Sequence, residues 1–508
     1  MRTLSENNTA EAVETVEEQQ APEQRYVSPR ETASYCLTYM GISALDKFMS
    51  AQKQTFMMTF LGLTGTQYGV MTTISSAWDA IDDPVSGVVI DRLRTRWGRL
   101  RPFLILPIPF WAIGAILMFT IPTGFTSTQK FLYATILTII YGIGVSYRTG
   151  WTLLLYNMTP NRQEQTSLVA TQQFVNLFNY LPSLMKVFVD IIPKITNNAV
   201  VMSDVYTFGA YFFVIIAAAA CVFGFFSMRE RVPQTTSEEQ SETSILSSFV
   251  YAIKNKPFLA LVVAWFFGNV ASVKGSAGED YFWINCMGSL SLEFTASLFT
   301  GLPGYVTTPL APKIIKRFGV RNTNIGGSAF SAITWGLLYL IGYNPFKSSV
   351  ANFAWVTAMM TLAGAPVRVN RVCEPLLLGD LYDYLEWKNG VRNEGVVSAV
   401  SSYAQKLSSS VIGLFSGVIY DIIGFTPQKD SYGNVVPHSD AKVKQSLFGV
   451  FTLFPMISWA GYAISLLFFK VNGKFKQQML KELAEQRAER AKRNSSTDNE
   501  DETEEPTE

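Results

Sequence analysis

Residues 78–103 read WDAIDDPVSGVVIDRLRTRWGRLRPF, an apolar run with embedded acids that leads into a basic turn. Asp79, Asp82 and Asp83 stand at i, i+3 and i+4, so a helix would place the three carboxylates on one face. Arginines then crowd the stretch from Arg92 to Arg101. This order predicts a membrane span that carries a polar site and ends in a cytoplasmic loop.

The composition of the whole chain agrees with a membrane protein. Of 508 residues, 48% are hydrophobic and 16% are charged, whereas a soluble domain has about a quarter charged residues. The expected fold class is an all-α polytopic membrane protein with about twelve transmembrane helices of about 20 residues each, in two pseudo-symmetric six-helix bundles. The expected spans lie near 33–61, 67–91, 102–122, 130–157, 167–192, 205–228, 257–284, 291–315, 323–343, 350–379, 395–424 and 445–470.

A long polar break after the sixth span divides the chain into two halves. The basic turn GVVIDRLRTRWGR follows the second span, and LAPKIIKRFGVR follows the second span of the other half. The echo favours a two-halved transporter, although any cytoplasmic loop would be basic. The expected organisation is a disordered cytoplasmic tail (1–32), a bundle (33–228), a central cytoplasmic loop (229–256), a second bundle (257–472) and a cytoplasmic tail (473–508).

The basic loops also predict the orientation of the chain. Lys and Arg gather in alternate loops, which places both termini and the central loop in the cytoplasm of a multi-pass inner or plasma membrane protein. A net charge of +1 gives no basic field for nucleic acid. The expected partners are therefore a small solute, a coupling cation and the lipid bilayer, and the expected state is a monomer.

Catalytic chemistry has few candidate residues. His438 is the only histidine, and the four cysteines are scattered without paired spacing. A histidine-rich metal site, a disulfide framework and a Ser-His-Asp triad are therefore not expected. The sequence predicts a protein that is not an enzyme and that needs no cofactor besides a coupling ion, Na⁺ or H⁺.

Two stretches carry a resemblance to a known family. Residues 78–103 resemble the second-span motif of the glycoside–pentoside–hexuronide:cation symporters, the melibiose permease branch of the major facilitator superfamily. Residues 379–425, GDLYDYLEWKNGVRNEGVVSAVSSYAQKLSSSVIGLFSGVIYDIIGF, resemble the span-ten to span-eleven region of that family. The likeness extends from Ser34 to Gly473. It implies the major facilitator fold and cation-coupled symport of a sugar, glycoside or hexuronide by alternating access.

The resemblance also implies roles for individual residues. Asp79 and Asp83 match the family's cation site, where Na⁺ could bind, and Asp82 stands where the melibiose-type pattern has Asn. Lys406 matches the span-eleven lysine near the sugar and cation sites. The matches for conformational gating are Asp91 and Arg92, which resemble a cytoplasmic latch of the superfamily, and Asp380 and Asp383, at the cytoplasmic end of span ten.

The sugar-binding pattern of melibiose permease is not intact. The first-span sugar acid of that family falls on Ser43, with Asp46 one turn later, and the span-four acid falls near Ser146, beside Arg148. Galactoside specificity is therefore not implied. Ser43, Asp46, Ser146 and Arg148 remain candidate solute-binding residues, together with Lys406.

The three acids also suggest a chemistry without any resemblance. Three carboxylates in one turn of a membrane span cannot all stay ionised and unpaired, so they hold protons or bind a hard cation. The resemblance adds one hypothesis, in which Asp82 replaces, as a cation ligand, the span-four acid of the family that this chain lacks. The alternative is that Asp82 faces Arg148 as a structural pair.

Other polar and aromatic residues leave alternatives open. Arg148, Arg368 and Arg371 could form a positive pocket for an anionic solute such as a hexuronide, or Arg371 could pair with Glu374 one turn away. Trp151 could stack on a sugar ring or serve in packing. Lys186 and Lys274 look buried and have no role implied by the resemblance. A carrier of a lysolipid or another amphiphile, or a solute sensor without transport, is the alternative function.

Overall fold

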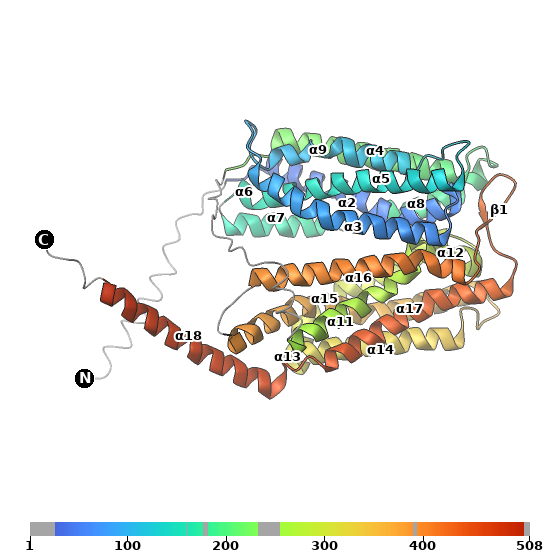
Figure 1. Ribbon diagram of the computed structural model, residues 1–508. Helices are drawn as coiled ribbons and strands as arrows, with labels where there is room; N and C mark the ends of the chain where they lie inside the picture. The colour runs from blue at the N-terminus through green and yellow to red at the C-terminus, as the bar shows by residue number, and fades with distance from the viewer. Residues whose placement is uncertain (1–25, 160, 176–180, 232–254, 390–393, 502–508) are drawn as a thin grey trace.

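The computed structural model describes residues 26–159, 161–175, 181–231, 255–389 and 394–501, and its helices form two stacked layers (Figure 1). Helices α2 to α9 form the N-terminal bundle, and helices α11 to α17 form the C-terminal bundle. Helix α18 (Gly473–Asp501) projects from one end of the molecule, called here the α18 end. The opposite end carries a short antiparallel hairpin of β1 (Gln428–Lys429) and β2 (Val435–Val436) and is called the hairpin end.

The helices of each bundle run back and forth between these two ends. The N-terminal bundle contains α2 (Pro29–Phe56), α3 (Gly65–Arg92), α4 (Ile108–Met118), α5 (Ser127–Arg148), α6 (Leu154–Met158), α7 (Arg162–Val175), α8 (Leu181–Ile195) and α9 (Met202–Ser227). The C-terminal bundle contains α11 (Lys256–Val270), α12 (Gly275–Met287), α13 (Ser291–Phe318), α14 (Val320–Ile341), α15 (Ser349–Asn389), α16 (Glu394–Ile422) and α17 (Ala441–Leu467). Short helices such as α4 and α6 continue neighbouring 3₁₀ turns (Arg101–Leu104 and Thr149–Leu153), so they complete single spans.

Local sequence signals fix where the helices begin. Ser28, Thr64 and Thr126 each cap a helix and form a capping box with a Glu or Gln three residues later, which satisfies free backbone N–H groups. Gly62 has a φ of 82° at the turn between α2 and α3, a conformation that glycine adopts without steric cost. Gly62 and Thr64 therefore define a short turn between α2 and α3 at the hairpin end.

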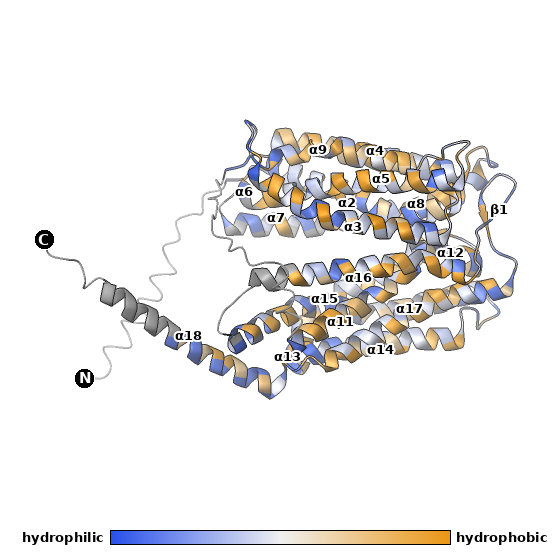
Figure 2. Ribbon diagram, viewed as in Figure 1, coloured by the Kyte–Doolittle hydropathy of each residue, from blue (hydrophilic) through white to orange (hydrophobic). Residues whose placement is uncertain are grey.

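Hydropathy follows the two layers. Apolar residues cover the helices, and polar residues concentrate at the helix ends and along α18 (Figure 2). Within the described ranges, seven helical segments are long and apolar enough to cross a membrane. Helix α3 falls outside that group because Asp79, Asp82, Asp83 and Asp91 interrupt its apolar run. The all-helical, two-bundle fold expected from the sequence is confirmed.

The observed helix ends differ from the expected span limits at both ends of the chain. Pro29 already begins α2, although the sequence placed the tail as far as residue 32. The C-terminal segment expected as a tail includes the long helix α18. Most of the expected central loop, residues 232–254, lies outside the described residues.

The two bundles touch most closely where α3 crosses α16 at the hairpin end. A Cβ added at Gly417 would lie 2.0 Å from the carbonyl oxygen of Gly65, and one added at Gly69 would lie 2.2 Å from the carbonyl oxygen of Leu414. Only glycine permits this approach of two backbones, as in other packed membrane helices. The Asp421 carboxylate adds bonds from the backbone N–H groups of Gly65 (2.9 Å) and Thr66 (2.6 Å).

Candidate functional site

The three acids of α3 lie at different depths. The whole Asp82 residue is only 8% exposed, and its Oδ2 has no hydrogen-bond partner within the described structure. Asp79 and Asp83 are half-buried. Helix α5 passes close to Asp79, because a Cβ on Gly142 would lie 3.1 Å from its Oδ1. A buried carboxylate without a partner is costly, so this cluster is suited to binding a positive charge.

Asp83 connects the two bundles. Ser146 of α5 donates a hydrogen bond of 3.0 Å from its Oγ to Oδ1 of Asp83. Lys406 of α16 forms an ion pair with the other carboxylate oxygen, Oδ2. The side chains of Asp83 and Lys406 are 35% and 53% exposed. The structure therefore brings together three residues that the sequence had placed in the candidate site.

Arg148 pairs with Asp46 of α2. Its Nη2 lies 2.7 Å from Oδ1 and 2.8 Å from Oδ2 of Asp46, and the hydroxyl of Tyr141 donates to Oδ1 at 3.2 Å. Arg148 is buried, whereas 44% of the Asp46 side chain is exposed. The alternative in which Asp82 faces Arg148 as a structural pair is therefore wrong, because the guanidinium faces α2 instead. Nη2 of Arg148 is thus engaged by Asp46, whereas its buried Nη1 has no partner within the described structure, and a role in binding an anionic solute stays a prediction.

Lys53 is a charged residue near the acid cluster of α3, and the sequence had not indicated it as part of the site. It lies on α2, and its charge acts on Asp79 together with the charge of Lys406. Lys53 follows Asp46 by seven residues, or about two helical turns, so the two residues share one face of α2. This seven-residue spacing was the feature of the sequence that could have indicated Lys53. Ser43, one turn before Asp46, is half-buried on the same helix.

Trp151 lies apart from the acids. Its residue is 4% exposed, and its ring packs against Tyr35 and Tyr39 of α2, with centroids 5.6 Å and 6.5 Å away. These contacts correspond to the packing alternative that the sequence had left open. They give no direct support to a role in stacking on a sugar.

A pocket of about 330 Å³ lies within the C-terminal bundle. Arg371 and Glu374 of α15 both line it, so the two members of the possible ion pair on this helix lie at one cavity. The remaining lining combines aromatic rings with amide groups: Trp265, Gly268, Asn269, Val367, Asn370, Gln405, Trp459 and Tyr462. Aromatic surfaces with a few polar groups are typical of small-molecule sites.

The pocket and the acid cluster meet at α16. Gln405 lines the pocket, and the next residue, Lys406, is bonded to Asp83. A displacement of this segment of α16 would therefore change both the pocket and the acid cluster. Of the solute-binding residues predicted from the sequence, Arg371 and Lys406 lie at this junction.

The candidate gating acids of α15 are held by α18. Lys476 Nζ lies 2.5 Å from Asp380 Oδ1. Arg487 Nη2 lies 3.2 Å from Asp383 Oδ1 and 2.5 Å from Glu386 Oε2. Arg92 is exposed at the end of α3, and the side chain of Asp91 lies outside the described structure. The clamp by α18 was not expected from the sequence.

Comparison with known proteins identifies the family. The model of the MFS/sugar transport protein family matches residues 34–473. The chain belongs to this family. The resemblance to glycoside–pentoside–hexuronide symporters is thereby confirmed, and the protein is a multi-pass membrane transporter of a small solute and not an enzyme.

Individual relatives are distant, and the matches cover three quarters or more of the chain. The isoprimeverose transporter of Lactiplantibacillus pentosus is 26% identical over 466 residues, which cover 90% of this chain and 92% of the relative. The glucuronide carrier protein homolog of Escherichia coli (strain K12) is 24% identical over 400 residues, which cover 76% and 84% of the two chains. Among solved structures, the nucleoside transporter NupG has a TM-score of 0.56 at 12% identity, and the match covers 88% of this chain and 100% of its own. That structural likeness shows the shared fold.

Proposed function

We propose that this protein is a symporter that couples a cation, Na⁺ or H⁺, to the movement of a sugar, glycoside or hexuronide by alternating access. The α18 end faces the cytoplasm, as the basic loops predict, and the hairpin end faces outward. Asp79, Asp82 and Asp83 form the cation site. The solute binds at the C-terminal pocket and along the adjoining faces of α2 and α5.

The observation that carries the proposal is the shared carboxylate of Asp83. One of its oxygens accepts from Ser146 in its own bundle, and the other is paired with Lys406 of the opposite bundle. A cation that binds Asp83 competes with the Lys406 ammonium for the same oxygen. Ion binding therefore changes a connection between the bundles, which is what coupling requires. A bound Na⁺ would add hydroxyl oxygens such as that of Ser146 to the carboxylates.

The conformation supports alternating access. Contacts between the bundles cluster at the hairpin end, where α3 and α16 cross at Gly65 and Gly417. Asp46, Asp83 and Lys406 lie part-way along their helices and keep exposed surface. Since the hairpin end is closed, we infer that water reaches them from the α18 end. The structure then corresponds to an inward-open state.

The chemistry of the pocket supports a carbohydrate-like solute. Trp265, Trp459 and Tyr462 offer apolar ring faces, while Asn269 and Gln405 offer amide donors and acceptors. This combination suits a molecule with many hydroxyl groups and apolar ring carbons. Arg371 could pair with the carboxylate of a hexuronide. Names of relatives that include isoprimeverose and glucuronide favour the same solute class.

Tracer uptake into proteoliposomes tests this function. A panel of neutral sugars, glycosides and hexuronides is offered with an inward Na⁺ gradient, with an inward proton gradient, and with neither. We expect uptake of one solute to require one gradient and to be lost in Asp83→Asn. Uptake that ignores both gradients, or an unaffected variant, would refute coupling at Asp83. Absence of uptake by folded protein for every solute would refute the proposed solute class.

A further inference from the structure

A second cluster of buried charges joins the bundles at the hairpin end. Lys186 of α8, in the N-terminal bundle, lies 2.7 Å from Asp280 Oδ1 of α12. The same ammonium forms an ion pair with Oε1 of Glu293, in the first turn of α13. The side chains of Lys186, Asp280 and Glu293 are only 5%, 0% and 10% exposed. These residues lie apart from the acids of α3, and the transport proposal does not use them.

The charges of this cluster do not balance. One ammonium faces two carboxyl groups, and the nearby pair of Lys274 and Glu279, at 2.5 Å, is already neutral. With every acid ionised the cluster has a net charge of −1 at a buried interface. An uncompensated buried charge is strongly unfavourable, so the group neutralises instead.

Hydrogen bonding identifies which acid is neutralised. Asp280 has a partner for each oxygen, since Lys186 bonds Oδ1 and the hydroxyl of Thr55 donates to Oδ2. Glu293 has Lys186 on Oε1, and its carboxyl group also meets the carboxyl groups of Asp280 and Glu279. Two ionised carboxylates cannot hydrogen-bond to each other, whereas a protonated carboxyl group donates its hydroxyl to a neighbouring carboxylate, and Glu293 is the acid common to both contacts. Glu293 is therefore the acid that carries the proton.

Among the residues that the structure describes, the surroundings of the cluster add no other compensating charge. The titratable groups that face the cluster are Lys186 from α8, Glu279 and Tyr281 from α12, Lys274 from the preceding turn, Tyr206 from α9 and Tyr420 from α16. A proton on one of the acids neutralises the excess negative charge of the cluster.

We propose that Glu293 is a proton-binding site that belongs to the closed hairpin end and is separate from the cation site on α3. Opening this end separates Lys186 from Asp280 and Glu293 and exposes both acids to water. Glu293 then releases its proton to the outer solution, and closure takes one proton up again. Because the closed state holds more protons, acid pH favours closure and alkaline pH favours opening.

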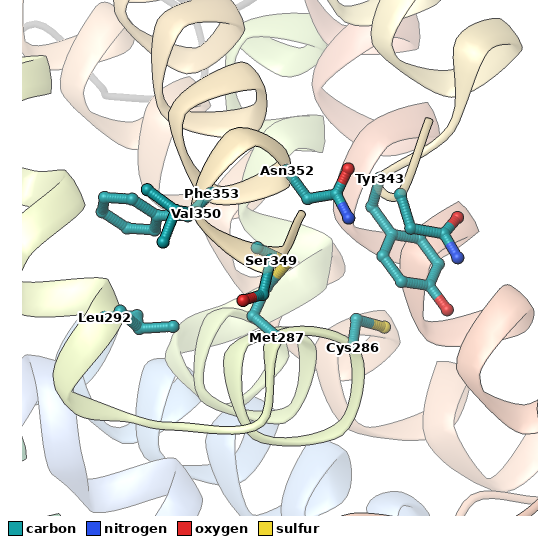
Figure 3. A pocket seen from close by; sticks show the side chains of 9 residues that line it. Cys286, Met287, Leu292, Tyr343, Ser349, Val350, Asn352 and Phe353 are labelled. Carbon is teal, nitrogen blue, oxygen red and sulfur yellow. The ribbon is translucent and has the colours of Figure 1, made fainter. Parts of the chain in front are cut away.

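Two pockets border the chain just before Glu293, although Glu293 itself lines neither of them. A pocket of about 260 Å³ is lined by Met287 and Leu292 (Figure 3), and Leu292 directly precedes Glu293. A second pocket, of about 190 Å³, borders the same turn between α12 and α13 through Gly288 and Leu290.

Infrared spectroscopy of the protein in nanodiscs, without solute or Na⁺, tests the proposal. We expect the carbonyl band of a protonated carboxylic acid in the unmodified protein near neutral pH. Glu293→Gln should remove this contribution, and so should Asp280→Asn, because Glu293 then ionises beside Lys186. Lys186→Met should enlarge the band, since two acids would face no ammonium. A band unchanged in all three variants would overturn the proposal.

Asp190→Asn is the matched control. Asp190 is another buried carboxylate between the bundles, but Lys194 (2.6 Å) and Ser289 (2.5 Å) already hold it as an anion. Its loss should leave the protonated-acid band unchanged. A loss of the band in this variant equal to that in Glu293→Gln would overturn the assignment to Glu293.

A distance measurement connects the proton to the movement. Spin labels at Phe125→Cys and Phe346→Cys, two exposed positions in hairpin-end loops of opposite bundles, are introduced after replacement of the four native cysteines. We expect the label distance to lengthen as pH rises, and to stay short at all pH values in Glu293→Gln. An equal pH response in both proteins would contradict the gate. Since neither readout needs transport, failure of the symport proposal would leave this result intact.

Discussion

Lys406 of α16 forms an ion pair with the Asp83 carboxylate, which also accepts a hydrogen bond from Ser146. The ammonium thus occupies part of the proposed cation site as a tethered competitor. We expect Lys406→Gln to bind the coupling cation several-fold more tightly, because the competitor is gone and the cluster becomes more negative. Calorimetric titration of purified protein measures the affinity. Lys47→Gln, an exposed lysine of α2, is the control, and unchanged affinity in Lys406→Gln would contradict competition.

A substitution of Asp82 tests whether this residue replaces the span-four acid that the chain lacks. Its buried Oδ2 has no partner within the described structure, so the oxygen is free to bind an ion. We expect Asp82→Asn to weaken cation binding about tenfold, which corresponds to about 1.4 kcal/mol. Ser86→Ala is the control, since Ser86 is buried one turn away and its hydroxyl donates to the backbone carbonyl of Asp83. Equal affinity in Asp82→Asn and the unmodified protein would refute the substitution hypothesis.

The pair of Asp46 and Arg148 predicts a loss of stability. Asp46→Asn leaves the buried guanidinium of Arg148 without its charged partner. We expect the variant to be less stable by about 1–3 kcal/mol, as for a buried polar group that loses its partner. Denaturant unfolding in detergent measures the change, with the neighbouring exposed Lys47→Gln expected to stay within about 0.5 kcal/mol. A variant of undiminished stability would show that Arg148 finds another partner.

The glycine crossing predicts a shift in conformation. Gly417→Ala places a methyl group against the Gly65 carbonyl, so α3 and α16 must separate at the hairpin end. We expect longer distances between labels in hairpin-end loops and slower uptake. Gly87→Ala on α3 is the control, because a Cβ there meets no atom within 4 Å. If both variants gave the same label distances, the crossing would not be a closure contact.

The ion pairs of α18 predict a local effect. Arg487→Ala removes the bonds to Asp383 and Glu386, but Arg487 is largely exposed, so the loss of global stability should be below about 1 kcal/mol. Hydrogen exchange in residues 473–489 should nevertheless become faster, because the helix loses its anchor on α15. Lys481→Ala, an exposed lysine on the same helix, should leave exchange nearly unchanged. Equal exchange in both variants would show that apolar packing alone holds α18.

Much of the fold could be predicted because each membrane span corresponds to a long run of apolar residues in the sequence. The spacing of Asp79, Asp82 and Asp83 also predicted their common helix and their placement inside the molecule. It could not predict that Arg148 faces Asp46, because that pairing depends on the relative rotation of α2 and α5. Helix rotation is set by packing across the bundle and leaves no periodic signal in the chain.

Contacts between the bundles were the least predictable. Lys186 was visible as a buried-looking cation, but its partners Asp280 and Glu293 lie about a hundred residues away. Their meeting depends on which conformation the two bundles adopt. The docking of α18 on α15 was missed for a similar reason, since its basic and acidic residues also fit a solvated tail.

The crossing at Gly65, Gly69 and Gly417 makes closure of the hairpin end independent of the side chains that line the C-terminal pocket. At this crossing, the hairpin-end contact is made of main chain and depends on the absence of side chains. Residues around the solute can therefore be exchanged during evolution without loosening it. New solute specificities can then arise at the pocket while the backbone contact at the hairpin end stays the same.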